Sequence, residues 1–216
     1  SSDLGAKTTW LDNSLLFNAS YSHIIWDDIQ SAADDPDAPV SFTGNAGEAT
    51  IDSVEIEVTK VSQRIDGLTF SGNVSLSNAR LSEEQVLDTN PFGAGKKGDD
   101  LPYVPDWTAG FSLEYVWAVR GGSLQGFGRL DLAWTDESNS AFNRNVPFDV
   151  MDSYGTAALR AGIDKGDEWG VDVFVTNVFD KDPHIYGTAS NFTKPGWDRW
   201  ATIQPRAVGV SMHKNF

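Results

Sequence analysis

The sequence predicts an all-β fold, and three observations refine this to part of an antiparallel transmembrane β-barrel. Apolar and polar residues alternate with a period of two along most of the chain. Short and long connections follow one another in turn between the predicted strands. Tryptophans mark both ends of the apolar faces. Membrane barrels combine strands that have one apolar and one polar face with short turns on one side and longer loops on the other.

The period of two is clearest in residues 107–117. Trp107, Phe111 and Trp117 share one face there, and Ser112 and Glu114 lie on the other. No segment shows a convincing helical period of 3.6 residues. The repeated alternation predicts about nine meandering strands. They lie near residues 3–10, 15–29, 47–63, 67–81, 105–118, 123–135, 153–164, 168–178 and 201–216.

The predicted connections are of two kinds. The short turns are rich in Gly, Asn and Asp, which suit tight hairpins. They fall at residues 11–14, 64–67, 120–122 and 164–167. The long loops fall near residues 30–46, 82–104, 136–152 and 179–200. This alternation is typical of outer-membrane barrels, which have short periplasmic turns and longer extracellular loops. A soluble β-sandwich can also have loops of uneven length, and it stays an alternative.

The aromatic residues give an independent indication of a membrane. Trp107 and Trp117 lie ten residues apart on one strand face. That separation is about 33 Å, or about 25 Å along the membrane normal for a tilt near 40°, which is the height of a barrel's apolar band. The turn pattern predicts an aromatic girdle with Trp107 and Trp134 on the extracellular side. It places Trp10, Trp117 and Trp169 on the periplasmic side.

Composition excludes several classes of function. The 216 residues include no Cys, so disulfides, thiolate metal sites and Cys nucleophiles are absent. The net charge of −15 argues against nucleic acid as a partner. No stretch approaches 18 consecutive apolar residues, which excludes a transmembrane helix. The mean hydropathy of −0.32 does not exclude a membrane barrel, because alternating barrel strands also score as hydrophilic. The isolated His23, His184 and His213 give no catalytic or metal spacing, so we expect no enzyme activity, metal or cofactor.

Six fragments occur in an order that carries a family resemblance. They are residues 5–19 (GAKTTWLDNSLLFNA), 26–30 (WDDIQ), 45–57 (NAGEATIDSVEIE), 98–107 (GDDLPYVPDW), 175–181 (VTNVFDK) and 205–210 (PRAVGV). Together they resemble the C-terminal barrel segment of TonB-dependent outer-membrane receptors, the siderophore and nutrient receptor family. The terminal Phe216, with Val208, Val210 and Met212, resembles that family's C-terminal assembly signal, and Lys214 stands where an apolar residue is usual.

The resemblance implies a domain organisation. Residues 1–216 would form the last part of a 22-stranded barrel. The plug domain, the TonB box and the earlier strands would lie outside this sequence. An isolated piece would expose two unpaired strand edges in lipid, which is costly, so we expect the chain to be a fragment of a longer protein.

The resemblance also implies a function, which is active transport across the outer membrane. The default cargo is a ferric siderophore, with carbohydrate, cobalamin or another nutrient as alternatives. Implied partners are outer-membrane lipid and lipopolysaccharide, the barrel-assembly machinery, and the TonB-ExbB-ExbD complex through the missing N-terminal part. A passive porin and a soluble β-sandwich binding module remain as alternatives of another class.

Candidate site residues fall into two groups. The predicted lumen face would provide a hydrated wall with cross-strand pairs, or contacts with the plug or the solute path. Its charged residues are Glu55, Glu57, Glu114, Arg129, Asp131 and Asp172. The long loops hold candidate ligand contacts, because binding residues concentrate in loops. These are Phe42, Phe92, Tyr103, Phe142, Arg144, His184, Tyr186, Phe192, Trp197, Arg199 and Trp200, of which Trp197 and Trp200 could instead belong to the girdle.

Overall fold

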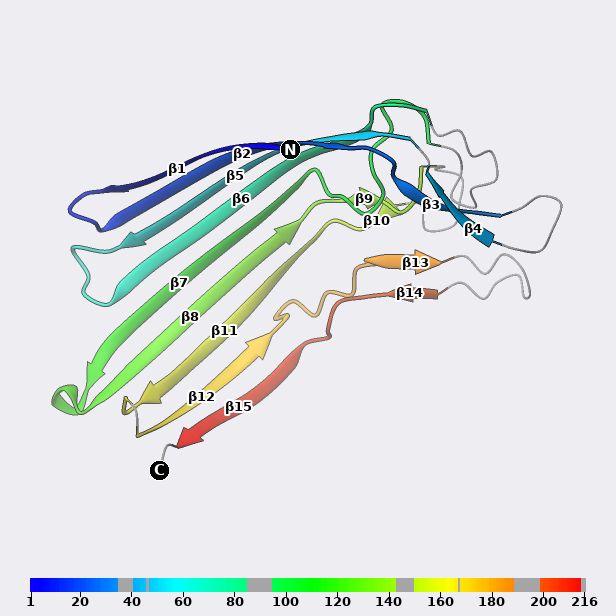
Figure 1. Ribbon diagram of the computed structural model, residues 1–216. Helices are drawn as coiled ribbons and strands as arrows, with labels where there is room; N and C mark the ends of the chain where they lie inside the picture. The colour runs from blue at the N-terminus through cyan, green and yellow to red at the C-terminus, as the bar shows by residue number, and fades with distance from the viewer. Residues whose placement is uncertain are drawn as a thin grey trace.

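The strands build one curved, antiparallel sheet (Figure 1). The computed structural model describes residues 1–34, 41–45, 47–84, 95–142, 150–166, 168–188 and 199–214. Within these ranges the sheet has nine strands, which pair in chain order as a meander. They are β1 (Ser2–Trp10), β2 (Leu15–Trp26), β5 (Ala49–Val61), β6 (Leu68–Leu81), β7 (Trp107–Val119), β8 (Leu124–Thr135), β11 (Tyr154–Asp164), β12 (Trp169–Thr176) and β15 (Ala207–Lys214). Each corresponds to a predicted strand, so the all-β prediction is confirmed.

Short turns join the strands at one end of the sheet, which we call the turn end (Figure 1). The backbone there adopts positive φ at Leu11, Asp12 and Asn13, as tight turns require. Gly67 has a φ of 80°, and its carbonyl accepts a hydrogen bond of 2.9 Å from the Val116 amide. A Cβ at Gly67 would lie 1.9 Å from the Val116 carbonyl oxygen, so the turn fits against β7 only with glycine.

The long connections gather at the opposite end, which we call the loop end (Figure 1). They contain small hairpins that the sequence did not predict: β3 (Gln30–Asp34) with β4 (Ser41–Asn45), β9 (Ser138–Asn139) with β10 (Val150–Met151), and β13 (Tyr186–Thr188) with β14 (Arg199–Ala201). The predicted start of the last strand at residue 201 is wrong, because Ala201 ends β14 and β15 begins at Ala207. Pro205 has no N–H to donate to a ladder in the gap between them. No helix in the described residues is long and apolar enough to span a membrane.

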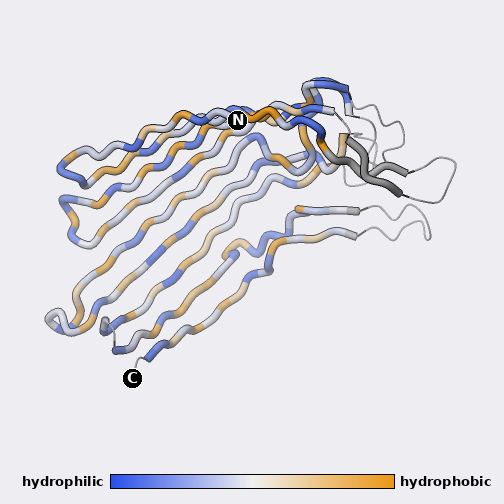
Figure 2. The backbone as a smooth tube through the Cα atoms, in the orientation of Figure 1, coloured by the Kyte–Doolittle hydropathy of each residue, from blue (hydrophilic) through white to orange (hydrophobic). Residues whose placement is uncertain are grey.

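The strand register sorts the side chains onto two faces. Ala109, Phe111 and Leu113 of β7 lie opposite Trp134, Leu132 and Leu130 of β8. Register carries the same apolar face through all the strands of the sheet, while Ser, Thr, Asn and charged residues take the alternate positions on the polar face. Figure 2 shows the resulting alternation of hydrophilic and hydrophobic positions along each strand.

Little of the apolar face is covered by other parts of the chain. Leu4, Val208 and Met212 are each 76% exposed, and among the described residues no second sheet packs on this face. The buried apolar cluster lies instead at the loop end, where Ile29, Ala49, Ala79, Leu81 and Leu101 meet. An apolar surface of this extent is stable only against another apolar phase or a partner.

Candidate functional site: the polar face and the loop end

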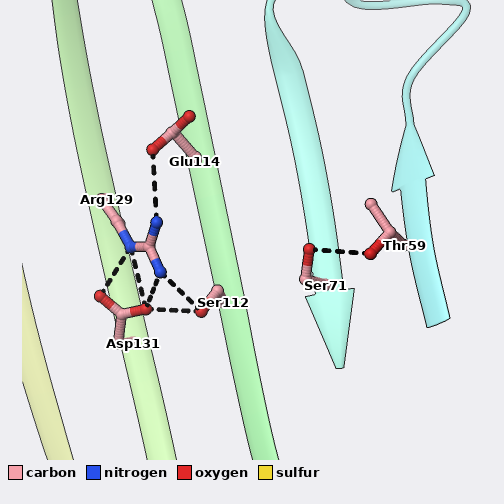
Figure 3. A network of polar contacts seen from close by, with 6 residues as sticks. All are labelled: Thr59, Ser71, Ser112, Glu114, Arg129 and Asp131. Atoms are coloured by element: carbon pink, nitrogen blue, oxygen red, sulfur yellow. Dashed lines mark hydrogen bonds and ion pairs between the residues drawn. The ribbon is translucent and has the colours of Figure 1, made fainter. Parts of the chain in front are cut away.

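The charged centre of the polar face is the guanidinium of Arg129 on β8 (Figure 3). Its Nε donates to both carboxylate oxygens of Asp131 at 3.0 and 2.9 Å, and its Nη2 donates to Asp131 Oδ1 at 2.8 Å. Nη2 also donates to Ser112 Oγ at 3.3 Å, and Nη1 lies 3.6 Å from Glu114 Oε2. Residues two apart on a strand share a face, and Glu114 is directly opposite Arg129, so the register alone brings these groups together.

A second ion pair lies on the same polar face, between β11 and β12. Arg160 Nε donates to Asp172 Oδ2 at 2.7 Å, and Arg160 Nη2 donates to Asp172 Oδ1 at 2.8 Å. Arg160 lies opposite Arg129 across the β8–β11 ladder. Two facing guanidinium groups repel each other, and the bidentate carboxylates of Asp131 and Asp172 compensate both charges.

On β2, β5 and β6 the polar face carries an amide–carboxylate pair and a pair of hydroxyl groups. The Asn18 amide donates to Glu57 Oε2 at 3.2 Å, and the Thr59 and Ser71 hydroxyls lie 3.3 Å apart. Glu55 lies between Ser20 and Ser75 in the register. All six charged residues predicted for the lumen therefore share the polar face, and Glu57, Glu114, Arg129, Asp131 and Asp172 make cross-strand or same-strand contacts there.

The loop end holds four of the predicted ligand contacts as two contacting pairs. The Tyr103 and Tyr186 rings stack with centroids 5.6 Å apart, and the Tyr103 hydroxyl donates to the Gly187 carbonyl at 3.4 Å. Burial, reinforced by Tyr186 and opposed by the Gly187 carbonyl, raises the pKa of the Tyr103 phenol. His184 meets Trp200 edge to face at 5.3 Å. We call Tyr103, His184, Tyr186 and Trp200 the aromatic cluster.

Hydrogen bonds from a third connection fix the aromatic cluster. The His184 amide donates to Asp152 Oδ2 at 2.9 Å, and the Asp152 amide donates to the His184 carbonyl at 3.1 Å. The Tyr103 amide donates to the Asn139 carbonyl at 2.6 Å. The connections that follow β6, β8 and β12 are thus joined into one surface.

Other predicted loop contacts have different positions. Phe142 is partly buried and packs against the apolar cluster around Leu81, which is a packing position. Phe42 lies in β4 and Arg199 in β14. Phe92, Arg144, Phe192, Trp197 and Phe216 lie outside the described residues.

The predicted girdle residues lie at the two ends of the apolar face. Trp107 and Trp134 stack at the loop end, with centroids 5.9 Å apart. At the turn end Trp117 stacks on Tyr115 at 5.4 Å, Trp10 donates to Thr8 Oγ1, and Trp169 lies opposite Lys214. Val208, Val210 and Met212 project from β15 on the apolar face.

Asn177 has a structural role that its place in the fragment 175–181 did not reveal. Its amide Nδ2 donates to the carbonyls of Lys181 at 2.8 Å and Gln204 at 3.0 Å, and its Oδ1 accepts from the Lys181 amide at 3.0 Å. Asp180 similarly accepts the Arg206 amide at 3.0 Å and pairs with its guanidinium at 3.2 Å. The fragments 175–181 and 205–210 are therefore two halves of one clamp between β12 and β15. Both fragments belong to the family resemblance, and this was the sign in the sequence that they have a structural role.

Taken together, the fold and the two faces define a class of protein. An antiparallel meander with one apolar face, one polar face, short turns and long loops is the wall of a membrane β-barrel. Among the described residues, no group of three or more His, Asp or Glu side chains is arranged to hold a metal ion.

The family follows from a direct match. Residues 1–178 match the family described as "TonB dependent receptor-like, beta-barrel". The chain belongs to this family, whose members are outer-membrane receptors and not enzymes. Among curated proteins, no sequence matches the chain.

Solved structures share the fold at low sequence identity. The ferric yersiniabactin uptake receptor FyuA from Yersinia pestis is 19% identical with a TM-score of 0.70, over 99% of this chain and 29% of that one. The siderophore receptor PiuA from Acinetobacter baumannii is 16% identical with a TM-score of 0.67, over 97% and 27%. The copper transporter OprC is 16% identical with a TM-score of 0.67, over 97% and 30%. The chain thus spans less than a third of these structures.

Proposed function

We propose that this chain forms barrel wall and extracellular loops of a receptor for TonB-dependent uptake of a ferric siderophore. The observation that carries the proposal is that both pairs of the aromatic cluster, Tyr103 with Tyr186 and His184 with Trp200, lie at the loop end of a barrel of this family. Separate connections supply Tyr103 and the pair Tyr186 and Trp200, as a surface that encloses a ligand requires. Ferric chelators with flat or aryl-bearing groups would stack on these rings.

The two faces of the sheet fit this role. The apolar face, with Trp residues at both ends, would contact lipid, and the polar face would line the interior. We propose that Glu55, Glu57, Glu114, Arg129, Asp131 and Asp172 face the lumen, where they would contact water or the plug. The compensated charges of Arg129 and Arg160 support a stable hydrated wall.

We further propose that residues 1–216 are the last part of a larger closed barrel. Within the described residues, the outer edges of β1 and β15 pair with no strand, and such edges are costly in lipid. The share of the solved receptors that the chain covers supports the same reading. Plug, TonB box and the contact with TonB would then belong to the remainder of the receptor.

Other cargoes are alternative outcomes of the binding test described at the end of this paragraph. The likeness to a protein named as a copper transporter keeps a metal cargo other than iron as the second candidate. Carbohydrate and cobalamin remain as the further alternatives. The test is equilibrium binding of a panel of ferric siderophores, copper, oligosaccharides and cobalamin to the full-length receptor in detergent.

Two variants sharpen this experiment. Tyr186→Ala and Trp200→Ala each remove one ring of the aromatic cluster and should weaken binding of the cognate ferric siderophore about tenfold or more, or about 1.4 kcal/mol. Tyr115→Ala is the matched control, because Tyr115 is similarly exposed and stacked but lies at the turn end. Absence of saturable binding by every ferric chelate would overturn the siderophore assignment. An equal loss of siderophore binding in Tyr115→Ala would show that the aromatic cluster is not part of the ligand site.

A further inference from the structure

A pocket opens on the polar face at the loop end, where β8 and β12 end and β11 begins. Its volume is about 370 Å³, close to the lower limit of about 300 Å³ for ligand pockets, so it suits one arm of a chelate. Several of its lining side chains share the polar face in the cross-strand pairs of β8 and β11. They are Asp131, Ala133, Thr135, Tyr154, Thr156 and Ala158. Thr176, Ile203 and Gln204 also line the pocket, and Leu132, Ala157 and Asn177 border it.

The pocket is joined to the aromatic cluster through two connections. Tyr154 lines the pocket and follows Asp152 by two residues, and Asp152 Oδ2 accepts a hydrogen bond from the His184 amide. A step of two residues spans at most about 7 Å between α-carbons. Gln204 also lines the pocket and lies four residues after Trp200. A single ligand can therefore contact the aromatic cluster and extend an arm into the pocket.

The hydroxyl groups of this pocket are open to a ligand. Elsewhere on the polar face hydroxyl groups have protein partners, since Ser112 donates to Asp131, and the Thr59 and Ser71 hydroxyls lie 3.3 Å apart. In the described part of the chain, no hydrogen bond or ion pair engages the side chains of the hydroxyl-bearing residues that line the pocket, which are Thr135, Tyr154, Thr156 and Thr176. Each hydroxyl group can donate and accept, so together they match uncharged polar groups.

The pocket offers no cation to an anionic ligand. None of its described lining residues is Lys or Arg. Its one carboxylate, Asp131, accepts three hydrogen bonds from Arg129, and the two charges compensate each other. An anionic group that entered the pocket would lose water without gaining a counter-ion, which is costly. The pocket therefore favours uncharged groups that have hydrogen-bonding atoms.

We propose that this pocket is an inner subsite for the cargo, and that it holds uncharged hydroxyl, amide or hydroxamate groups of a ferric chelate. The aromatic cluster stacks on flat groups of the same chelate, while the pocket binds a polar arm. The inference rests on the proposed function and narrows its substrate class to ferric chelates without net negative charge. Thr156 determines this specificity most directly, because Ala133 opposite it has no polar side chain that competes for its hydroxyl group.

The test is equilibrium binding of three ferric chelates of similar size to the full-length receptor in detergent. One is a neutral trihydroxamate with aryl groups, one is an anionic tricatecholate, and one is an anionic hydroxycarboxylate. The trihydroxamate and the tricatecholate both carry aryl groups, so stacking alone does not separate them. The neutral chelate should bind at least about tenfold more tightly than either anionic chelate, because it alone enters the pocket without an uncompensated charge.

Substitutions at Thr156 separate hydrogen bonding from charge. Thr156→Val removes the hydroxyl group at nearly constant shape and should weaken binding of the neutral chelate about fivefold. Thr156→Lys supplies a cation and should shift the ratio of affinities at least about tenfold toward the tricatecholate. Thr69→Val and Thr69→Lys are the matched controls, because Thr69 lies on the same face near the turn end, opposite Glu114. Heat-dependent migration in gels shows which variants fold, and Thr156→Val decides if Thr156→Lys does not fold.

The outcomes distinguish this subsite from the proposed function. Preference for the neutral chelate, with effects confined to the Thr156 variants, supports the subsite. Equal or tighter binding of either anionic chelate by the wild type, or equal effects of the substitutions at Thr156 and Thr69, would overturn it. The proposed function would still stand in that case if Tyr186→Ala weakened binding. Absence of binding by all three chelates would overturn both.

Discussion

The indole of Trp117 on β7 lies directly over Gly126 on β8. The two residues are opposite each other in the ladder, and a Cβ on Gly126 would lie 2.4 Å from Trp117 Cε2. An aromatic ring that covers a cross-strand glycine pins the register and shields the backbone of the neighbouring strand. Trp134 covers Gly155 in the same way at the loop end, where the corresponding approach is 2.8 Å. The girdle tryptophans therefore have a packing partner within the sheet in addition to the membrane interface.

Replacing Gly126 should destabilise the barrel. In Gly126→Ala the new methyl group forces the Trp117 ring to move, which should cost about 1–3 kcal/mol of unfolding free energy. The measurement is the temperature at which the full-length receptor loses its compact, fast-migrating form in a denaturing gel. Gly128→Ala is the control, since its Cβ would lie 3.9 Å from Trp117 Cζ3, an ordinary contact. Equal effects of both substitutions would contradict the proposed packing.

The Arg129 contacts should be visible in the salt dependence of stability. Arg129→Met removes the cation and leaves Asp131 and Glu114 close together, so unfolding free energy at low salt should fall by about 1 kcal/mol, as for a half-exposed pair. Added salt should narrow the difference from wild type, because it screens the remaining repulsion. Thr59→Val serves for comparison, since it removes the uncharged Thr59–Ser71 contact and should show no salt dependence. A salt-independent loss in Arg129→Met would mean that its packing, and not its charge, stabilises the wall.

Asn177 should be the most sensitive residue of the connection between β12 and β15. It is only 7% exposed, and Asn177→Ala leaves the Lys181 amide and two carbonyls without this partner. Buried groups left unpaired should cost about 1–3 kcal/mol in total unfolding free energy. Asn177→Asp keeps the acceptor and loses both donated bonds, so it should fail to restore stability. Wild-type stability in either variant would show that the clamp is not needed.

Charge at the loop end should influence which cargo associates fastest. The first long connection, residues 27–48, contains no Lys or Arg and carries Asp27, Asp28, Asp34, Asp35, Asp37 and Glu48. Among ferric chelates of similar size, those with less negative charge should associate faster, and salt should reduce the difference. Stopped-flow association rates with the full-length receptor at two salt concentrations measure this. A preference for the most anionic chelate at low salt would contradict it.

The fold was predictable because the period of two is a direct consequence of strand geometry, and the Trp107 to Trp117 spacing reports strand length. Strand limits were less predictable. Asp28 has a φ of 55°, and β2 ends before it at Trp26, although the apolar pattern continues to Ile29.

The candidate site was only partly predictable. Cross-strand neighbours such as Glu114 and Arg129 follow once the register is known, but the sequence does not specify the register between separate hairpins. The contacts of Tyr103 with Tyr186 and of His184 with Asp152 join distant connections, and no periodicity reports such contacts. The sequence also does not distinguish a loop aromatic that contacts ligand from one that packs inside the protein. Phe142 was predicted to contact ligand, but it packs against the apolar cluster.

The proposed transport is tested by measuring uptake of the cognate ferric siderophore, labelled with radioactive iron, into cells that carry the full-length receptor. We expect saturable uptake that is lost when TonB is absent or when the proton gradient of the inner membrane is collapsed, while binding at the cell surface remains. Uptake that is unsaturable and independent of TonB would instead indicate a passive pore and would rule out TonB-dependent transport.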